Sequence, residues 1–267
     1  MKRASTQKSR VFISIVVLSA GFLAPAAFAD EKEDSDLGLT VQLGYEKTVG
    51  KYGQRANTTT STSLTSITYD SDDYAINIDV PYLEQRGPGR VFLLPRRRII
   101  IVGSDRVASG IGDVTSGYTR YVLNEEDDGV DLDLGGIVKF ATASASKGLG
   151  TGKADYSLQS VLSESFGDFH VSGTLGYTFV GKPANLNYRN AVYAAIDGSY
   201  KITSEVSAGV TVNAGGSIIP GQPRTRDTTA YLDFSPLKKL KVGAYYLVGH
   251  STQSPDRGAG ITVTASF

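Results

Sequence analysis

The last ten residues of the chain, Gly258–Phe267, read GAGITVTASF and decide the fold class. Within them Ile261, Val263, Ala265 and Phe267 alternate with threonine and serine, so a strand of this sequence has one apolar face. A carboxy-terminal strand that has one apolar face and ends on an aromatic residue is typical of outer-membrane β-barrels. We therefore expect this strand to close a barrel and to engage the barrel-assembly machinery through Phe267.

The amino-terminal segment indicates export. Residues 1–10 carry four basic side chains and no acidic one, residues 11–23 form an apolar run, and residues 27–29 read Ala-Phe-Ala. This is the order of a secretory signal peptide, with a basic start, an apolar centre and a small-residue cleavage site. We expect residues 1–29 to be removed and residues 30–267 to form a single barrel domain in the outer membrane of a Gram-negative bacterium.

Charge and composition exclude several classes of protein. Without the signal peptide the chain holds 23 basic and 27 acidic side chains, a net charge of −4, which argues against nucleic acid as the partner. Beyond residue 29 the apolar runs, such as Ile99–Val102, are far too short for a membrane helix, which needs roughly 18 residues. The chain has no cysteine, so it contains neither a disulfide nor a thiolate metal site.

Alternation of apolar and polar residues predicts about twelve strands. The clearest runs from Phe169 to Val180, where phenylalanine, valine, leucine and tyrosine alternate with histidine, serine, threonine and glycine. The strand that begins at Leu37 shows the same pattern. The two segments Thr59–Tyr69 and Asp113–Leu123 are weaker, because their sequences do not indicate which face points outward.

The connections between these segments favour a barrel over a β-sandwich. Five short connections alternate with six long ones, the longest of which is Gly87–Gly112. Outer-membrane barrels alternate in this way, with short periplasmic turns and longer external loops. The pattern predicts an all-β, antiparallel up-and-down transmembrane barrel with an even strand number and both termini in the periplasm. Lipid has no hydrogen-bonding groups, so the sheet must close.

Several motifs resemble those of the outer-membrane transporter-like family associated with the meta-pathway of phenol degradation. The similarity runs from about residue 60 to the end of the chain. The motifs are Ile78–Leu83, Gly87–Gly89, Gly110–Asp113, Lys139-Phe140, Gly148–Gly152 and Asp155–Leu158. The resemblance implies a passive, cofactor-free channel for small hydrophobic or aromatic molecules. The segment Arg90–Ser109 departs from it, being more basic and more apolar, so the mouth is expected to be particular to this protein.

A barrel of twelve strands has an interior that is wider than a core filled by side chains and narrower than an open aqueous channel. Passage should then depend on a few inward side chains. These side chains could bind solute, or could pair across strands and stabilise the barrel, since an unpaired charge in a narrow lumen is costly. Lys139 among several aspartates is the clearest candidate for such a pair. The lumen candidates are Asp79, Asp113, Lys139, Asp155, Asp197, Lys201 and Asp233, with Tyr193, Tyr231 and Tyr245.

The segment Gly87–Gly112 is the candidate gating loop. It combines two apolar stretches with five arginines, namely Arg90, Arg96, Arg97, Arg98 and Arg106. It could fold over the mouth and receive a hydrophobic solute. Its arginines could instead contact lipopolysaccharide phosphates, which guanidinium groups bind well. A third interpretation is a local hairpin that extends two strands above the membrane.

Catalysis has little support in the sequence. An outer-membrane phospholipase needs a histidine and a serine together on the lipid-facing surface, and only His170 and His250 are present. His170 is expected to point inward near a periplasmic turn, and His250 begins an outer loop. The glycines of Gly148–Gly152 open no helix and lack the Lys-Ser/Thr pair of a phosphate-binding loop. Two distant histidines also make a metal site improbable.

The sequence therefore predicts a monomeric or weakly oligomeric twelve-stranded outer-membrane barrel that acts as a non-enzymatic channel for small hydrophobic or aromatic compounds. The alternative is a closed structural barrel whose outer loops bind lipopolysaccharide or a protein.

Overall fold

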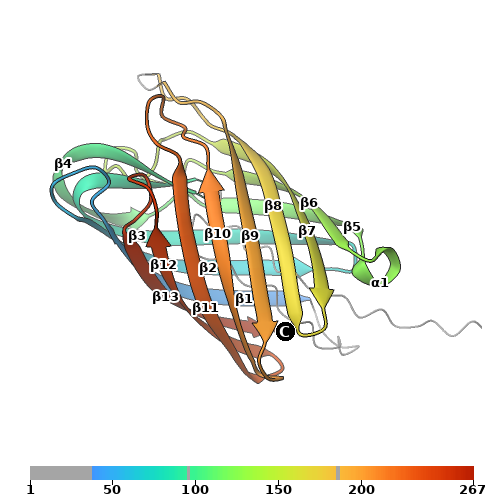
Figure 1. Ribbon diagram of the computed structural model, residues 1–267. Helices are drawn as coiled ribbons and strands as arrows, with labels where there is room; N and C mark the ends of the chain where they lie inside the picture. The colour runs from blue at the N-terminus through green and yellow to red at the C-terminus, as the bar shows by residue number, and fades with distance from the viewer. Residues whose placement is uncertain (1–37, 95–96, 185–186) are drawn as a thin grey trace, which may run out of the picture.

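The computed structural model describes residues 38–94, 97–184 and 187–267 and shows an antiparallel β-barrel (Figure 1). The predicted signal peptide lies outside the described residues. The strands are β1 (Leu39–Gly50), β2 (Thr58–Asp70), β3 (Tyr74–Leu94), β4 (Arg97–Ile111), β5 (Thr115–Leu123), β6 (Asp131–Lys139), β7 (Asp155–Phe166), β8 (Phe169–Phe179), β9 (Ala191–Lys201), β10 (Val206–Gly215), β11 (Thr225–Leu237), β12 (Leu240–Gly249) and β13 (Arg257–Ser266).

Of these 13 strands, 12 form the closed ring, as the sequence predicts. Strand β1 pairs with β2 on one side and with β13 on the other, so the first and last strands close the barrel. The strand β4 is the additional one. It pairs with Tyr82–Leu94 of β3, whereas β5 pairs with Tyr74–Asp79 of the same strand. The second half of β3, Tyr82–Leu94, therefore pairs with β4 and not with β5, its neighbour in the ring.

The two faces of the sheet differ in the way that a membrane barrel requires. Large apolar side chains point outward, as on β8, where Leu175 is 59% exposed, while Thr174 and Thr178 on the same strand are buried. The structure also resolves the two ambiguous strands. In β2 the even-numbered residues from Thr58 to Thr68 point inward, and in β5 Tyr118 points outward beside the buried Thr119. A belt of exposed apolar side chains on a closed barrel suits a lipid environment.

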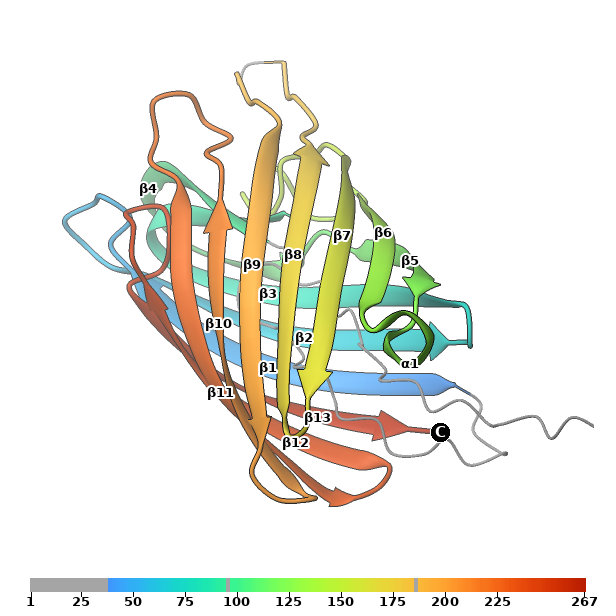
Figure 2. The ribbon, with the colours of Figure 1, turned by 45° about the vertical axis from the view of Figure 1, so that its right-hand side comes forward.

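The two ends of the barrel carry different connections. Figure 2 shows the hairpin strand β4 at the end with the longer connections, and the carboxy terminus and the short helix α1 (Glu125–Asp128) at the other end. Among the described residues, no helix has the length and apolar character needed to cross a membrane. The long connections and β4 define what we call the outer end, and the short turns define the inner end.

The segment Gly87–Gly112 is a β-hairpin and not a structureless loop, so the third of the three interpretations describes its backbone. The register of β3 against β4 shifts between Gly87 and Gly89, where Gly87 has a φ of 132°. The side chain of Gln85 bridges this bulge, because its Oε1 accepts a hydrogen bond from the Val91 backbone N at 3.1 Å and its Nε2 donates to Val91 O. The β-branched run Ile99–Val102 favours a strand, which explains the extension.

Candidate functional site

The lumen candidates all come from inward positions of their strands or lie at the outer end of the barrel. Most are almost fully buried, and Tyr245 and Lys201 are half-buried. The almost fully buried ones are Asp79, Asp113, Lys139, Asp155, Asp197, Asp233, Tyr193 and Tyr231. The structure divides most of them between a cluster around Lys139 at the outer end and a series of tyrosines along the wall from β7 to β1. Asp79 stands apart and accepts hydrogen bonds from Asn77 and Thr115, each at 3.0 Å.

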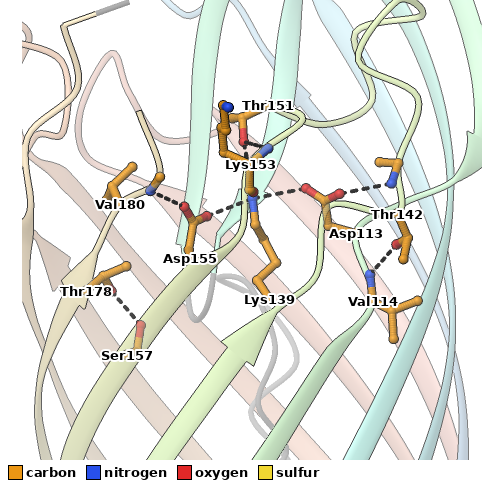
Figure 3. A network of polar contacts seen from close by, with 12 residues as sticks. Asp113, Val114, Lys139, Thr142, Thr151, Lys153, Asp155, Ser157, Thr178 and Val180 are labelled. Carbon is orange, nitrogen blue, oxygen red and sulfur yellow. Dashed lines mark hydrogen bonds and ion pairs between the residues drawn. The ribbon is translucent and has the colours of Figure 1, made fainter. Parts of the chain in front are cut away.

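The Lys139 cluster is an ionic contact between the last residue of β6, the first residue of β7 and the link between β4 and β5 (Figure 3). Lys139 Nζ lies 3.0 Å from Asp113 Oδ2 and 2.7 Å from Asp155 Oδ2, and all three side chains are at most 2% exposed. Thr151 Oγ1 accepts a further, longer hydrogen bond from Nζ at 3.4 Å. The pairing that was expected for Lys139 is thus present. Two carboxylates with one ammonium give the cluster a net negative charge.

Both carboxylates of the cluster also hold outer connections in place. Asp113 Oδ1 accepts a hydrogen bond from the backbone N of Ala143 at 2.9 Å, and Asp155 Oδ1 accepts one from Gly181 N at 2.7 Å. Gly150 lies so close that a Cβ there would be 2.8 Å from Asp113 Oδ2. The cluster therefore fixes residues 140–154 and the start of residues 180–190 against the barrel rim.

Apolar side chains pack beside this cluster at the outer end. Leu83 and Leu93 of β3 pack against Ala143 and Leu149 of the connection after β6, and all four are buried. A second group joins Val91 to Tyr52, which reaches in from the connection between β1 and β2. A third consists of Val180, Tyr188, Ala191 and Ile218. Apolar contacts therefore hold the outer connections to the rim, whereas the inward strand faces below them carry hydroxyl and carboxylate groups.

Sequence reasoning did not find the mouth residues Tyr52, Leu149 and Tyr188, since none lies in an alternating strand. The sequence contains one weak signal, at Tyr52, because the following Gly53 indicates a turn. In the structure Tyr52 lies in that turn with a φ of 51°. Burial among apolar groups raises the pKa of the Tyr188 hydroxyl to about 12. This residue lies in the external connection between β8 and β9.

Three inward tyrosines share one arrangement along the wall. Each ring lies over a glycine of the neighbouring strand, and its hydroxyl donates to a side chain one strand further on. Tyr193 crosses Gly176 to Gln159 Oε1 at 2.9 Å, Tyr231 crosses Gly209 to Asp197 Oδ1 at 3.0 Å, and Tyr245 crosses Gly260 to Glu46 Oε2 at 3.1 Å. Glycine is required under each ring, because a Cβ would lie within 2.3 Å of a ring atom. These tyrosines therefore join three strands at a time.

The five arginines of the candidate gating loop can be placed only by strand. Arg90 belongs to β3, and Arg97, Arg98 and Arg106 belong to β4, in register with Leu94, Leu93 and Gly87 of β3. Arg96 and the side-chain positions of the other four lie outside what the structure describes. Their part in gating therefore stays a prediction.

The two histidines occupy different ends of the barrel. His170 Nδ1 lies 3.1 Å from Ser165 Oγ, inside the barrel beside the turn between β7 and β8. Its Nε2 has no hydrogen-bond partner in the described part of the chain, so no carboxylate completes a catalytic triad there. His250 Nε2 lies 2.9 Å from Thr228 Oγ1 at the outer end. The described residues contain no group of three side chains arranged to hold a metal ion.

Comparisons with known proteins agree with this architecture. The family model described as "Putative MetA-pathway of phenol degradation" matches residues 29–267. Among solved structures, an outer membrane channel from Pseudomonas putida F1 superposes with a TM-score of 0.65 at 11% identity, covering 89% of this chain and 100% of that one. The translocator domain of the autotransporter NalP from Neisseria meningitidis gives 0.53 at 12% identity, covering 88% and 90%. No curated protein matches the chain.

Proposed function

Since the chain belongs to the phenol-degradation MetA-pathway family, we propose that it is an outer-membrane channel through which small hydrophobic or aromatic molecules enter passively. The observation that carries this proposal is the apolar packing at the outer mouth. Leu83, Leu93 and Leu149 are buried there at the entrance to a polar interior. A path that opens between these packed side chains would favour solutes that lose little on leaving water. The similar channel from Pseudomonas putida F1 supports the barrel fold of such a channel.

The architecture implies how the solute would be selected. The Lys139 cluster bonds Ala143 and Gly181, which belong to two outer connections, to the rim, so we expect packed side chains to narrow the mouth. A charged solute that parts Leu83 from Leu149 would lose hydration there, at a cost that a neutral aromatic avoids. No catalytic group is required for this function, and we infer that the protein performs no reaction.

Uptake in whole cells tests the proposal directly. Entry of a labelled neutral aromatic, an aromatic acid and a sugar of similar size is compared in otherwise identical cells with and without this protein. We expect the largest gain for the neutral aromatic, a smaller gain for the aromatic acid and none for the sugar. Equal gains for all three would make the protein a general pore, and no gain for any would favour a structural barrel.

Shortening the β3–β4 hairpin sharpens the test. Arg90–Leu94 pairs in register with Arg97–Ile101, so replacing residues 90–101 by a two-residue turn should leave the ring intact. We expect the entry of the neutral aromatic to fall while the protein still shows the heat-dependent gel shift of a folded barrel. The control is Leu158→Ala on the lipid-facing side of β7, where the side chain is 61% exposed. An unchanged rate in the shortened protein would remove the hairpin from the pathway.

One observation favours the alternative function, in which the outer loops bind lipopolysaccharide. Apart from the hairpin and the buried Asp113, the outer connections carry Lys51, Arg55, Lys147, Lys153, Lys182, Arg189 and Arg224 against Asp256. Such a basic rim suits lipid phosphates in the outer leaflet. Binding of purified lipopolysaccharide to the folded barrel that is lost at high salt would support it. The engagement of the barrel-assembly machinery by the final strand is a separate proposal, tested by the folding yield of a variant without Phe267.

A further inference from the structure

A carboxylate inside the barrel wall has hydroxyl partners but no cation. Asp197 lies on the inward face of β9 and is 9% exposed. Thr211 Oγ1 donates to its Oδ2 at 2.5 Å, and Tyr231 Oη donates to its Oδ1 at 3.0 Å. Neither donor carries a charge, and no residue in the described ranges forms an ion pair with Asp197. The side chains around it therefore orient this carboxylate without neutralising it.

A buried imidazole nitrogen lies near Asp197. His170 on β8 pairs in register with Ser199, which is two residues from Asp197 on the same face of β9, and it interacts electrostatically with that carboxylate. Diagonal neighbours of this kind are roughly 7–8 Å apart, close enough to contact one small group between them. His170 is 2% exposed, and its Nε2 has no partner among the described residues. If Nδ1–H donates to Ser165, Nε2 is a hydrogen-bond acceptor.

A second buried carboxylate lies on the same wall, two strands from Asp197 and four residues further along, and one lysine offsets it. Asp233 on β11 is 5% exposed, and its Oδ2 has no hydrogen-bond partner within the described part of the chain. It interacts electrostatically with Asp197 and with Lys241 of β12. The inward charged side chains of β8–β12 are Asp197, Asp227 and Asp233 against Lys201 and Lys241, so with a neutral imidazole this wall retains one negative charge. A buried charge of that kind is costly unless a counter-ion pairs with it.

We propose that the inward wall over β8–β12 binds an organic monocation, with Asp197 as the counter-ion of its ammonium group and His170 Nε2 as a second acceptor. An ammonium carries several N–H donors and one positive charge, which match two separate acceptors and a net charge of −1. We call this arrangement the Asp197 site. Any part it plays in uptake rests on the proposed channel function, whereas binding itself does not.

Equilibrium binding to the purified barrel tests the Asp197 site separately from uptake. The full mature barrel, folded in detergent micelles, is dialysed against labelled benzylammonium, benzyl alcohol or benzoate, which share a ring and differ in charge. We expect benzylammonium to bind about tenfold more tightly than benzyl alcohol, and benzoate least of all. Equal binding of benzylammonium and benzyl alcohol would overturn the proposal, because it would mean that the wall carries no available negative charge, as when Asp197 holds a proton.

Variants locate the effect. Asp197→Asn keeps the shape and should reduce the preference for benzylammonium to about that of benzyl alcohol. The control Asp168→Asn removes an exposed carboxylate from the nearby β7–β8 turn and should change nothing. An unchanged preference in Asp197→Asn would refute the site. If that variant does not fold, the comparison of the three ligands on the unmodified barrel still decides. Binding without uptake would contradict the channel function and leave the site intact.

Discussion

The two buried carboxylate clusters of this barrel solve the same physical problem differently. At the outer end, Asp113 and Asp155 share Lys139 at 3.0 and 2.7 Å, and the cluster holds two connections. In the wall, Asp197 has only the hydroxyls of Thr211 and Tyr231 among its described partners. The difference indicates that the first cluster serves stability and the second keeps a charge available. Variants of the two clusters test that distinction.

The largest effect is expected for Lys139→Met, which removes the cation from the outer cluster. Asp113 and Asp155 would then lie buried and unpaired, at a cost of about 3–5 kcal/mol in the free energy of unfolding. Urea titration of the barrel, followed by its heat-dependent gel migration, measures the loss. Lys147→Met, at an exposed lysine in the same outer connection, is the control and should change little. A stable Lys139→Met barrel would mean that the cluster contributes no net stability.

A smaller loss of stability is expected when Gly209 is replaced, because this glycine makes room for the ring of Tyr231, which bonds to Asp197. In Gly209→Ala the new Cβ would lie 2.3 Å from Tyr231 Cζ, so the ring must move, at a cost of about 1–3 kcal/mol. Gly198→Ala is the matched control, because the nearest atom to its Cβ is Phe169 Cζ at 3.6 Å. The new Cβ would also lie 2.8 Å from the backbone O of Gly198, so adding Gly209→Ala to Tyr231→Ala should cost less than Gly209→Ala does alone, but not nothing. Additive losses would show another origin.

Asp197→Asn should leave stability within about 1 kcal/mol of the original, or raise it slightly. The amide oxygen can still accept from Thr211 or Tyr231, and the burial of a charge is avoided. The same urea titration gives the answer. A loss comparable to that of Lys139→Met would show that Asp197 is a structural partner like Asp155, and the distinction between the clusters would fail.

Much of the ring was predictable from residue order because the strand period is two and lipid exposes one face. The closing strand at Phe267, the even ring and the pairing of Lys139 follow from alternation and from the cost of an unpaired charge. The hairpin of residues 87–112 was one of three interpretations, and residue order could not select it, since its two halves are stabilised by each other and by Gln85 across a bulge. The inward faces of β2 and β5 were also undetermined, because threonine, serine and tyrosine suit either environment.

The partners of the inward tyrosines depend on register, which residue order does not reveal. Tyr231 reaches Asp197 only because β9, β10 and β11 align Gly209 under its ring. The inward position of His170 was predicted correctly from alternation. Its position near Asp197, with an Nε2 that has no partner among the described residues, becomes apparent only from the pairing of β8 and β9. Alternation predicts which face a residue occupies, and the neighbours across the sheet determine what it can bind.

The smallest effect concerns Tyr188, at the outer end but outside the ionic cluster. Its buried hydroxyl has no partner in the described residues, and burial raises its pKa to about 12 from the ordinary value of 10.0. The neutral form is favoured in the folded barrel, so its contribution is complete below pH 10 and is lost as the pH rises from 10 to about 12. Tyr188→Phe should match the original at pH 8 and exceed it by about 1 kcal/mol at pH 12. Parallel losses in both proteins between those pH values would show that Tyr188 ionises without opposition, and that the outer mouth is wetter than its packing indicates.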